Sequence, residues 1–362
     1  MTRIAILTPT MMRGDAVGND VLGMYEALRK RGEDVRIYAE SWTLTEPKVW
    51  SAFEITRFLK DPADLLIYHY SMGWEIGLDL LRAPKFKTAI KYHNVTPAEF
   101  FKGISRSHES MCREGRAQLK TLARAGCDLY LSASEYNMRE LLAEGADESK
   151  SFVVPPFHHI DHLDAIQPDL SVLDAHRDGK TNILMVGRIS PNKGHVALIE
   201  AFATYYYNYN ANSRLVIVGK EEESFNEYSS LLRRIVAGLE LEDAVIFTGG
   251  VSEAALKAYY MAAHVFMITS EHEGFCVPLV EAMAMKVPIV ARASTAIPDT
   301  VGRAGLVWKE SNPYLLAESI DFLVRDESLG AAFGAMGWQR YAQNFTNEEI
   351  EATFLQALSN LG

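Results

Sequence analysis

Short apolar runs rich in β-branched residues alternate with longer amphipathic stretches along almost the whole chain of 362 residues. Alternation of this kind predicts parallel, doubly wound sheets covered by helices. The pattern occurs twice, and an irregular polar stretch over 155–180 separates the two series. We expect strands at 3–8, 35–39, 65–69, 88–92, 129–132 and 152–154 in the first series, and at 182–186, 214–218, 245–248, 265–269 and 288–291 in the second.

Size and composition agree with two domains, and they argue against a nucleic-acid-binding protein and against a disulfide-rich or zinc-binding one. A single hydrophobic core stops growing at roughly 250–300 residues, and the chain has ordinary globular composition, with 48% hydrophobic and 23% charged residues. The net charge of −11 argues against a general nucleic-acid-binding protein, which would show a basic surface. The cysteines, at positions 112, 127 and 276, fit neither a disulfide framework nor a zinc site.

The lengths of the apolar segments indicate the cellular compartment in which the protein is expected. The apolar run at 4–7 is too short for the core of a signal peptide. No stretch reaches the roughly 18 apolar residues of a membrane span. We therefore expect a cytoplasmic protein, with peripheral contact at the inner face of the membrane left open.

The segment 270–283, SEHEGFCVPLVEAM, is the strongest functional motif. It follows a predicted strand and opens a helix at Pro278, a residue favoured at the first helical position. The amino terminus of a helix is a ready anion site. Glu273 in the loop and Glu281 in the helix would repel phosphate, so we interpret both as acceptors for sugar or ribose hydroxyls.

A second motif, VGRISPNKG at 186–194, joins the first strand of the second series to a helix. Arg188 and Lys193 place two cations at the carboxyl edge of that strand, where ligands bind in open α/β folds. A planar guanidinium and a compact ammonium together suit a diphosphate.

Together the two motifs resemble those of the retaining glycosyltransferases of family 4, also called glycosyl transferases group 1. The resemblance extends over essentially the whole chain. It implies the GT-B fold, an α/β architecture of two Rossmann-like domains whose parallel sheets face each other across a cleft. The implied domains are an acceptor domain over 1–165, a nucleotide-sugar donor domain over 166–342, and a C-terminal helix over 343–362 that returns to the first domain.

The resemblance also implies roles for residues of the donor domain. Arg188 and Lys193 would neutralise the donor diphosphate, Glu281 would hold the ribose, and Glu273 would contact hydroxyls of the donor sugar. Further donor contacts are expected from the backbone of Val251, Gly274, Phe275 and Cys276.

In the first domain, the loop 13–19 resembles the glycine-rich loop of the family, and Gly14 would approach the donor phosphates. Asp15 stands where the family usually has a second glycine. We therefore consider two roles for Asp15: an acceptor contact, shared with Asn19, or simple turn formation. His93 matches the family histidine that faces the donor sugar, and with Glu273, Arg188 and Lys193 it completes the predicted catalytic group.

We expect no metal and no cofactor besides the nucleotide diphosphate sugar. The D-x-D triad that usually holds a metal-bound sugar nucleotide is missing from the sequence. Arg188 and Lys193 would supply the positive charge instead. The histidines at 158, 159 and 162 lack carboxylate partners at metal-ligand spacing. The family's usual same-face mechanism needs no protein nucleophile, and no candidate nucleophile stands out.

The segment 85–124 contrasts with the acidic chain, since it holds nine basic and three acidic residues. One explanation is a solvated helix face. The other is a surface for anionic lipid or a lipid diphosphate acceptor, with Phe100 and Phe101 inserting beside it.

As donor we favour a UDP-hexose, and UDP-glucose in particular, over GDP-mannose. The resemblance favours a sugar or lipid-linked saccharide as acceptor, in polysaccharide or glycolipid assembly. Three other classes are considered. A nucleotide-sugar epimerase would need acid and base carboxylates that we do not locate, and an NAD-dependent oxidoreductase would need a G-x-G-x-x-G motif that is absent. A catalytically inactive, nucleotide-binding scaffold is the third.

Overall fold

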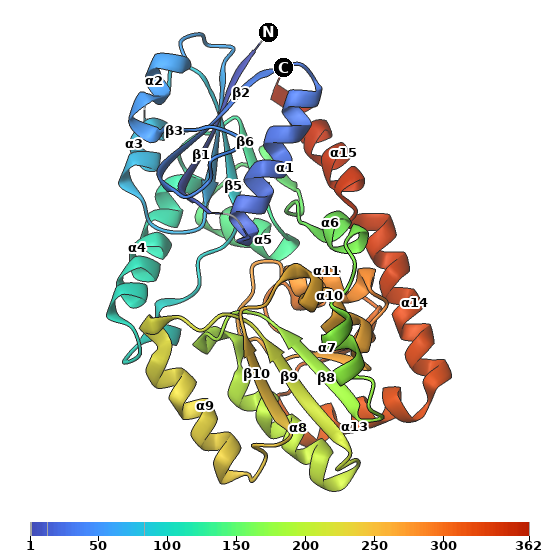
Figure 1. The fold of residues 1–362 in the computed structure, drawn as a ribbon. Helices are drawn as coiled ribbons and strands as arrows, with labels where there is room; N and C mark the ends of the chain where they lie inside the picture. Colours follow the sequence, from blue (N-terminus) through green and yellow to red (C-terminus); the bar gives the residue numbers. More distant parts are fainter. Residues whose placement is uncertain (1, 13, 83, 362) are drawn as a thin grey trace. The chain divides into compact units, whose positions relative to one another are not determined.

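The computed structural model describes residues 2–12, 14–82 and 84–361, and the chain divides into two compact units (Figure 1). The first unit comprises Met1–Glu99, Ser107–His159 and Phe345–Gly362, and the second comprises Phe100–Arg106 and Ile160–Asn344. Each unit is built on a parallel sheet with helices packed against it, which confirms the predicted α/β class with two Rossmann-like units.

The sheet of the first unit has the strand order β3-β2-β1-β4-β5-β6-β7. Its strands are β1 (Arg3–Met11), β2 (Asp34–Trp42), β3 (Val49–Ser51), β4 (Leu65–Tyr70), β5 (Lys87–Tyr92), β6 (Leu129–Ser132) and β7 (Ser151–Val153). Its helices are α1 (Ala16–Lys30), α2 (Ile55–Phe58), α3 (Glu75–Arg82), α4 (Arg106–Ala123), α5 (Glu135–Glu144) and α15 (Asn347–Leu358).

Alternation along the strands divides the core of the first unit between the two faces of its sheet. Ile67 and Ala89 belong to a cluster that includes Met24 of α1 and Phe354 of α15. The intervening Tyr68 lies in another cluster, with residues of α3 and α4. Successive side chains of a strand point to opposite faces, so α1 and α15 cover one face and α3 and α4 the other.

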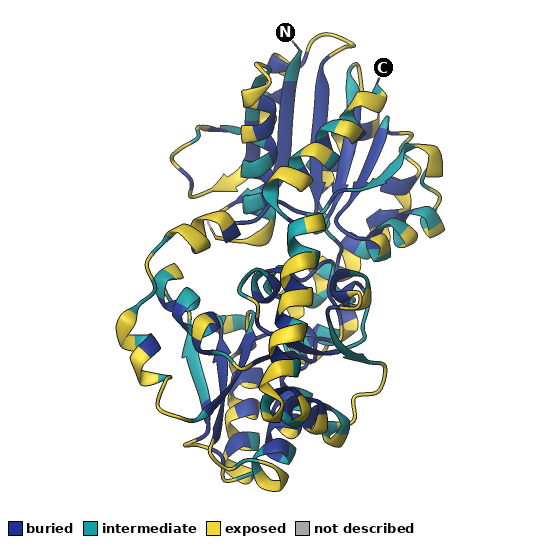
Figure 2. Ribbon diagram, turned by 90° about the vertical axis from the view of Figure 1, so that its right-hand side faces the viewer, coloured by how far each residue is buried: buried dark blue, intermediate teal, exposed yellow. Residues whose placement is uncertain are grey.

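The sheet of the second unit has the order β10-β9-β8-β11-β12-β13. Its strands are β8 (Thr181–Val186), β9 (Ser213–Val218), β10 (Val245–Gly249), β11 (Val265–Ile268), β12 (Ile289–Arg292) and β13 (Gly305–Trp308). Its helices are α6 (Ile160–Ala165), α7 (Leu170–Ala175), α8 (His195–Asn208), α9 (Asn226–Gly238), α10 (Glu253–Ala262), α11 (Val277–Ala284), α12 (Ile297–Val301), α13 (Pro313–Arg325) and α14 (Glu327–Asn344). Figure 2 shows the strands of both sheets as largely buried and exposed residues on the outer sides of the helices.

Three parts of this architecture differ from the sequence prediction. The strands β3 and β13, at the edges of the two sheets, were not predicted. The stretch 155–180 was predicted as irregular but contains α6 and α7, and Leu173 of α7 packs against Ala258 and Ala262 of α10. The short segment Phe100–Arg106 clusters with the second unit, a detail the predicted domain limits at 165 and 342 did not include.

The strand orders locate the position where a ligand is expected in each unit. The order reverses between β1 and β4 in the first sheet and between β8 and β11 in the second. Open α/β sheets bind ligands outside the carboxyl ends of the strands at such a switch point. The polar motifs predicted from the sequence follow β1, β8 and β11, and therefore lie at these two points. No helix within the described residues combines the length and apolar character needed to cross a membrane.

Candidate functional site

Two loops at the switch point of the second unit are joined through Asn192. Its carbonyl accepts a hydrogen bond from the backbone N–H of Glu271 at 2.8 Å, and its side-chain amide donates to the carbonyl of His272 at 3.1 Å. The hydroxyl of Ser190 donates to the Asn192 side chain at 2.7 Å. These contacts hold the loop after β8 against the loop after β11.

Gly194 allows the closest approach between these two loops. It has a left-handed backbone, with φ of +66°, and a β-carbon at this position would lie 2.2 Å from the carbonyl oxygen of Thr269. The hydroxyl of Thr269 donates to the Gly194 carbonyl at 2.9 Å. Because only glycine fits here, the start of α8 packs directly on the end of β11 and carries Lys193 to the second loop.

Lys193 and Glu273 form an ion pair at the meeting point of the loops. The ammonium lies 2.7 and 2.9 Å from the two carboxylate oxygens, and the hydroxyl of Ser270 donates to the same carboxylate at 2.8 Å. The side chains are 17% and 7% exposed. A pair this buried is screened little by solvent, so the structure brings two of the predicted catalytic residues into strong electrostatic contact.

The backbone of Glu273 is also held in place. Its N–H donates to the hydroxyl of Thr295 at 2.8 Å, and this hydroxyl donates to the Glu273 carbonyl at 2.8 Å. Sequence reasoning did not identify Ser270 or Thr295 as supports, because a hydroxyl residue in a loop carries no distinctive signal.

Arg188 lies apart from this pair. Its guanidinium is 2.7 Å from the carboxylate of Glu222, and its side chain is 63% exposed. Without a ligand, Arg188 and Lys193 therefore form two separate ion pairs, and their joint role toward a diphosphate stays a prediction. An exposed ion pair is weak, so an incoming anion would compete for Arg188 at little cost.

Glu281 lies one helical turn inside α11 and accepts a hydrogen bond from the hydroxyl of Tyr260 at 2.7 Å. Burial raises the pKa of the Glu281 carboxyl, and the Tyr260 hydrogen bond opposes this shift. Burial, followed by the charge of Glu281, raises the pKa of Tyr260 well above its ordinary value, which keeps its hydroxyl a hydrogen-bond donor. Tyr260 comes from α10, and the sequence motif contains no signal for it.

The remaining donor residues flank helix starts. Cys276 is buried with a left-handed backbone, φ +76°, and precedes α11, which begins at Val277 and not at Pro278 as predicted. The carbonyl of Phe275 accepts from the hydroxyl of Thr300 at 2.8 Å, which holds this turn in place. Val251 lies in the loop that joins β10 to α10.

In the first unit, Gly14 and Asp15 lie between β1 and α1. Arg13 lies outside the described residues, and Gly14 has a left-handed backbone with φ of +84°. Asp15 caps α1 by accepting a hydrogen bond from the backbone N–H of Gly18. Turn formation therefore explains Asp15. Its acceptor contact, and that of Asn19, remains a prediction.

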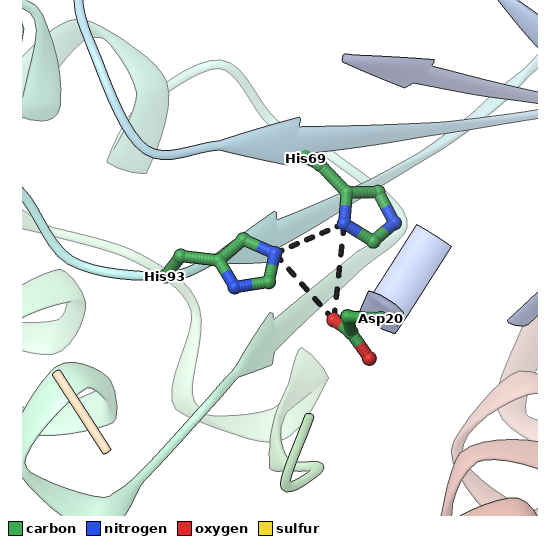
Figure 3. A group of neighbouring side chains, drawn as sticks. All are labelled: Asp20, His69 and His93. Atoms are coloured by element: carbon green, nitrogen blue, oxygen red, sulfur yellow. Dashed lines mark hydrogen bonds and ion pairs between the residues drawn. The ribbon is translucent and has the colours of Figure 1, made fainter. Parts of the chain in front are cut away.

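His93 follows β5 and belongs to a buried group on the α1 side of the sheet (Figure 3). Its Nε2 is 2.9 Å from Nδ1 of His69 and 3.5 Å from a carboxylate oxygen of Asp20. The ammonium of Lys91 lies 3.6 Å from the same oxygen. The sequence analysis identified only His93, although a lysine at the end of an apolar strand was a visible signal for Lys91.

The histidines at 158, 159 and 162 do not form a joint site in the described structure. Nε2 of His158 lies 2.6 Å from the carbonyl oxygen of Phe345 in the first unit. Nε2 of His162 lies 2.9 Å from a carboxylate oxygen of Glu253 in the second unit. Each of these two imidazole rings thus contacts a residue of its own unit.

The basic segment 85–124 is partly used by the fold itself. Lys91 is buried beside Asp20, and Arg116 lies 2.9 Å from both Glu140 and the carbonyl of Val95. The predicted insertion of Phe101 into a membrane is wrong, because this ring is buried and stacks on Phe225 within the second unit. Lys85, Lys102 and Lys120 remain at the surface.

The fold and these loops define the class to which the chain belongs: α/β proteins with two Rossmann-like units and charged loops at the switch point of the second unit. Residues 172–340 match the family model described as "Glycosyl transferases group 1". The D-inositol 3-phosphate glycosyltransferase of Kineococcus radiotolerans is 27% identical over 300 residues, which cover 78% of this chain and 68% of the relative. A capsular polysaccharide biosynthesis glycosyltransferase of Staphylococcus aureus is 29% identical over 47% of this chain and 44% of its own length.

Solved structures share the fold over nearly the whole chain. The HepE protein of Anabaena, in complex with UDP and glucose, superposes with a TM-score of 0.78 and 16% identity, covering 99% of this chain and 100% of that one. The sucrose-phosphate synthase of Thermosynechococcus elongatus superposes with a TM-score of 0.79 and 19% identity, covering 100% and 99%. Residues 172–340 are therefore similar to the group 1 glycosyltransferases, and the whole chain shares the GT-B fold of the solved structures.

Proposed function

We propose that this chain transfers a hexose, with retention of configuration, from a nucleotide diphosphate sugar to a sugar or lipid-linked acceptor in polysaccharide or glycolipid assembly. UDP-glucose is the favoured donor. The observation that carries the proposal is the Lys193–Glu273 pair, held at the switch point of the second unit beside the start of α11.

The chemistry follows from the charges. Lys193 would neutralise the diphosphate as it becomes the leaving group, and Arg188 would exchange its exposed partner Glu222 for phosphate oxygens. Glu273 and Glu281 would accept hydrogen bonds from hydroxyls of the hexose and the ribose. Cations and a helix amino terminus aimed at the developing charge lower the barrier without a metal ion. The leaving phosphate would accept the proton of the acceptor hydroxyl on the same face.

Different relatives support different donor nucleotide sugars. HepE has been crystallised with UDP-glucose, which supports a uridine nucleotide. A phosphatidylinositol monomannoside mannosyltransferase of Mycobacterium tuberculosis that uses GDP-mannose is 29% identical over 44% of this chain, which supports the alternative. A catalytically inactive, nucleotide-binding scaffold is the alternative from another class.

The test is isothermal titration of the purified protein with UDP, GDP and ADP in the presence of EDTA. One nucleotide should bind, and Lys193→Met should weaken it by about tenfold to a hundredfold, since a hydrogen bond to a charged group contributes about 1.5–3 kcal/mol. Lys180→Met is the matched control, because Lys180 precedes β8 at the opposite end of the same strand. This control should leave the affinity unchanged.

A double variant distinguishes direct contact from charge compensation. If Lys193 touches the diphosphate, Lys193→Met with Glu273→Gln should bind as weakly as Lys193→Met alone. If Lys193 only neutralises Glu273, the double variant should regain affinity, and the proposed role of Lys193 fails. Absence of nucleotide binding would refute the proposal as a whole, and binding without donor hydrolysis would favour the inactive scaffold.

A further inference from the structure

The first unit places three ionisable side chains where its strand pattern predicts apolar ones, and helix α1 adds a fourth. Ile67 and Ala89 point into the core between the sheet and α1, and the next positions on the same face are His69, Lys91 and His93. His69 and Lys91 are direct neighbours in the register of β4 and β5. Asp20 meets them from α1, and Asp20, His69 and Lys91 have no exposed surface.

Burying charges is costly unless they are paired and hydrogen-bonded, and here most partners are supplied. One carboxylate oxygen of Asp20 accepts from the backbone N–H of Phe157 at 2.9 Å, and the other faces the ammonium of Lys91 at 3.6 Å. Lys91 also donates to the carbonyl of Val154. Burial and the charge of Lys91 lower the pKa of His69 well below its ordinary value. Burial lowers the pKa of His93 well below its ordinary value in the same way, with neighbouring His69 and the charge of Lys91 adding to it, so both rings are neutral at pH 7.

The contact between the rings requires one proton between Nδ1 of His69 and Nε2 of His93, which are 2.9 Å apart. If His93 donated this proton, neutral His69 would carry its own proton on Nε2. That nitrogen is buried without a hydrogen-bond partner among the described residues, and an orphaned buried N–H is rare and costly. The favoured arrangement therefore has His69 donating from Nδ1, which leaves the proton of His93 on its Nδ1.

We infer that Asp20, His69 and Lys91 are positioning residues that fix the ring and tautomer of His93, so that its Nδ1–H is presented as a hydrogen-bond donor to the sugar of the bound nucleotide sugar. Figure 3 shows this second nitrogen of His93 pointing away from His69 and Asp20. The Nδ1–H tautomer is the less common one of a neutral imidazole, so it needs a neighbour that occupies Nε2. The inference rests on the proposed function only for the identity of the ligand.

A metal ion is the competing occupant of this group, because Asp20, His69 and His93 each offer a ligand atom within 4.8 Å of the others. The distances argue against it. Tetrahedral zinc with bonds of about 2.0–2.1 Å separates its ligand atoms by roughly 3.3 Å, whereas the two ring nitrogens are 2.9 Å apart, the length of a hydrogen bond. The ammonium of Lys91 also lies 3.6 Å from the carboxylate oxygen that the metal would need.

Two variants of His69 test the inference. His69→Asn keeps an N–H close to the position of Nδ1, and His69→Phe keeps a ring of similar size but has no donor. Tyr130→Phe is the control for lost stability, since it removes buried hydrogen bonds to Ala123 and Cys127 on the other face of the same sheet.

The first measurement is the ¹⁵N spectrum of the imidazole rings in the full chain without ligand, with His93 assigned through His93→Gln. The wild type, His69→Asn and Tyr130→Phe should show His93 protonated on Nδ1. In His69→Phe the proton should move to Nε2, which would then face the Asp20 carboxylate at 3.5 Å. A wild-type His93 protonated on Nε2 would overturn the inference, as would stoichiometric zinc by elemental analysis whose removal changes these signals.

The second measurement compares the affinities for UDP-glucose and UDP. His69→Phe should weaken UDP-glucose by about tenfold, the equivalent of one hydrogen bond, and leave UDP unchanged. His69→Asn and Tyr130→Phe should bind both like the wild type. An unchanged ratio in His69→Phe would refute the link to the sugar. If the wild type binds neither compound, the proposed function fails, and the spectrum still decides the state of His93.

Discussion

Two ionic contacts of the described structure show how the same residue types serve different purposes. Lys193 keeps 17% of its side chain exposed beside the buried Glu273, at a sheet edge where a ligand would compete for both charges. Lys91 and Asp20 have no exposed surface, and the nearest groups are protein atoms. The first pair is therefore suited to exchange partners, and the second to hold a fixed arrangement.

The buried carboxyl of Asp20 should make the free energy of unfolding depend on pH. Burial raises its pKa from 3.8 to about 6, against the opposing charge of Lys91. As the pH rises from about 4 to about 6, the unfolded chain loses this proton first, so the free energy of unfolding falls. A shift of this size corresponds to about 3 kcal/mol. Chemical denaturation at pH 4 to 7 should show this loss in the wild type but not in Asp20→Asn.

Asp64 provides a control for which the change of stability with pH has the opposite sign. Although burial alone would raise its pKa, hydrogen bonds from the backbone N–H groups of Asp61 and Lys60 lower it below 3.8. The stability that Asp64 contributes is present above pH 3.8 and is lost as the pH falls through its lowered pKa. Relative to Asp64→Asn, the wild type should therefore lose stability toward acid. The same sign for both variants would contradict the assignment.

At the scale of elements, α3 and α4 of the first unit border a surface on which Lys120 and Arg124 are exposed, while Arg82 is paired with Glu75 and Asp79 of its own helix. A pocket of about 480 Å³ is lined by the apolar side chains of Leu78, Leu81 and Ala125 and by the basic side chains of Arg82, Lys120 and Arg124. An apolar floor with cationic walls is complementary to the headgroup region of an anionic lipid.

Membrane contact through this surface remains a proposal, and it predicts preferential binding to vesicles that contain anionic phospholipid. Each basic residue near such a surface contributes roughly 1 kcal/mol, so Lys120→Gln with Arg124→Gln should weaken partitioning by about 30-fold at low salt. Lys180→Gln with Lys309→Gln, in the second unit, is the charge-matched control. Flotation that is equal for neutral and anionic vesicles would reject the proposal.

At the scale of the whole molecule, each unit has its own sheet and core, and the chain enters the first unit again at Phe345. Phe354 of α15 is fully buried in the core of the first unit. Stability in a chain of this kind need not be lost in a single step.

The two units should therefore respond to different perturbations in calorimetry. UDP at 100 times its dissociation constant should stabilise the second unit by about 2.7 kcal/mol. Phe354→Ala should destabilise the first unit by about 3–5 kcal/mol and leave UDP affinity unchanged. A loss of UDP binding in this variant, or a single transition that both perturbations shift, would contradict independent units.

Much of the fold could be predicted from the sequence because burial within a strand or helix is a local, periodic property. The apolar runs of β1, β4, β8 and β11 are visible without any contact, and both sheets were expected for that reason. The helix start at Val277 was misplaced by one residue, and the edge strands β3 and β13 were missed.

The sequence by itself determined which residues follow which strands, and hence that Lys193 and Glu273 belong to loops at a ligand-binding edge. Only the tertiary structure decided that Lys193 pairs with Glu273 while Arg188 pairs with Glu222. It alone brought Asp20 of α1 to His69 and Lys91. The physical reason is that periodicity fixes the face on which a side chain lies, whereas its partners depend on strand order and register, which are set by packing across the whole unit.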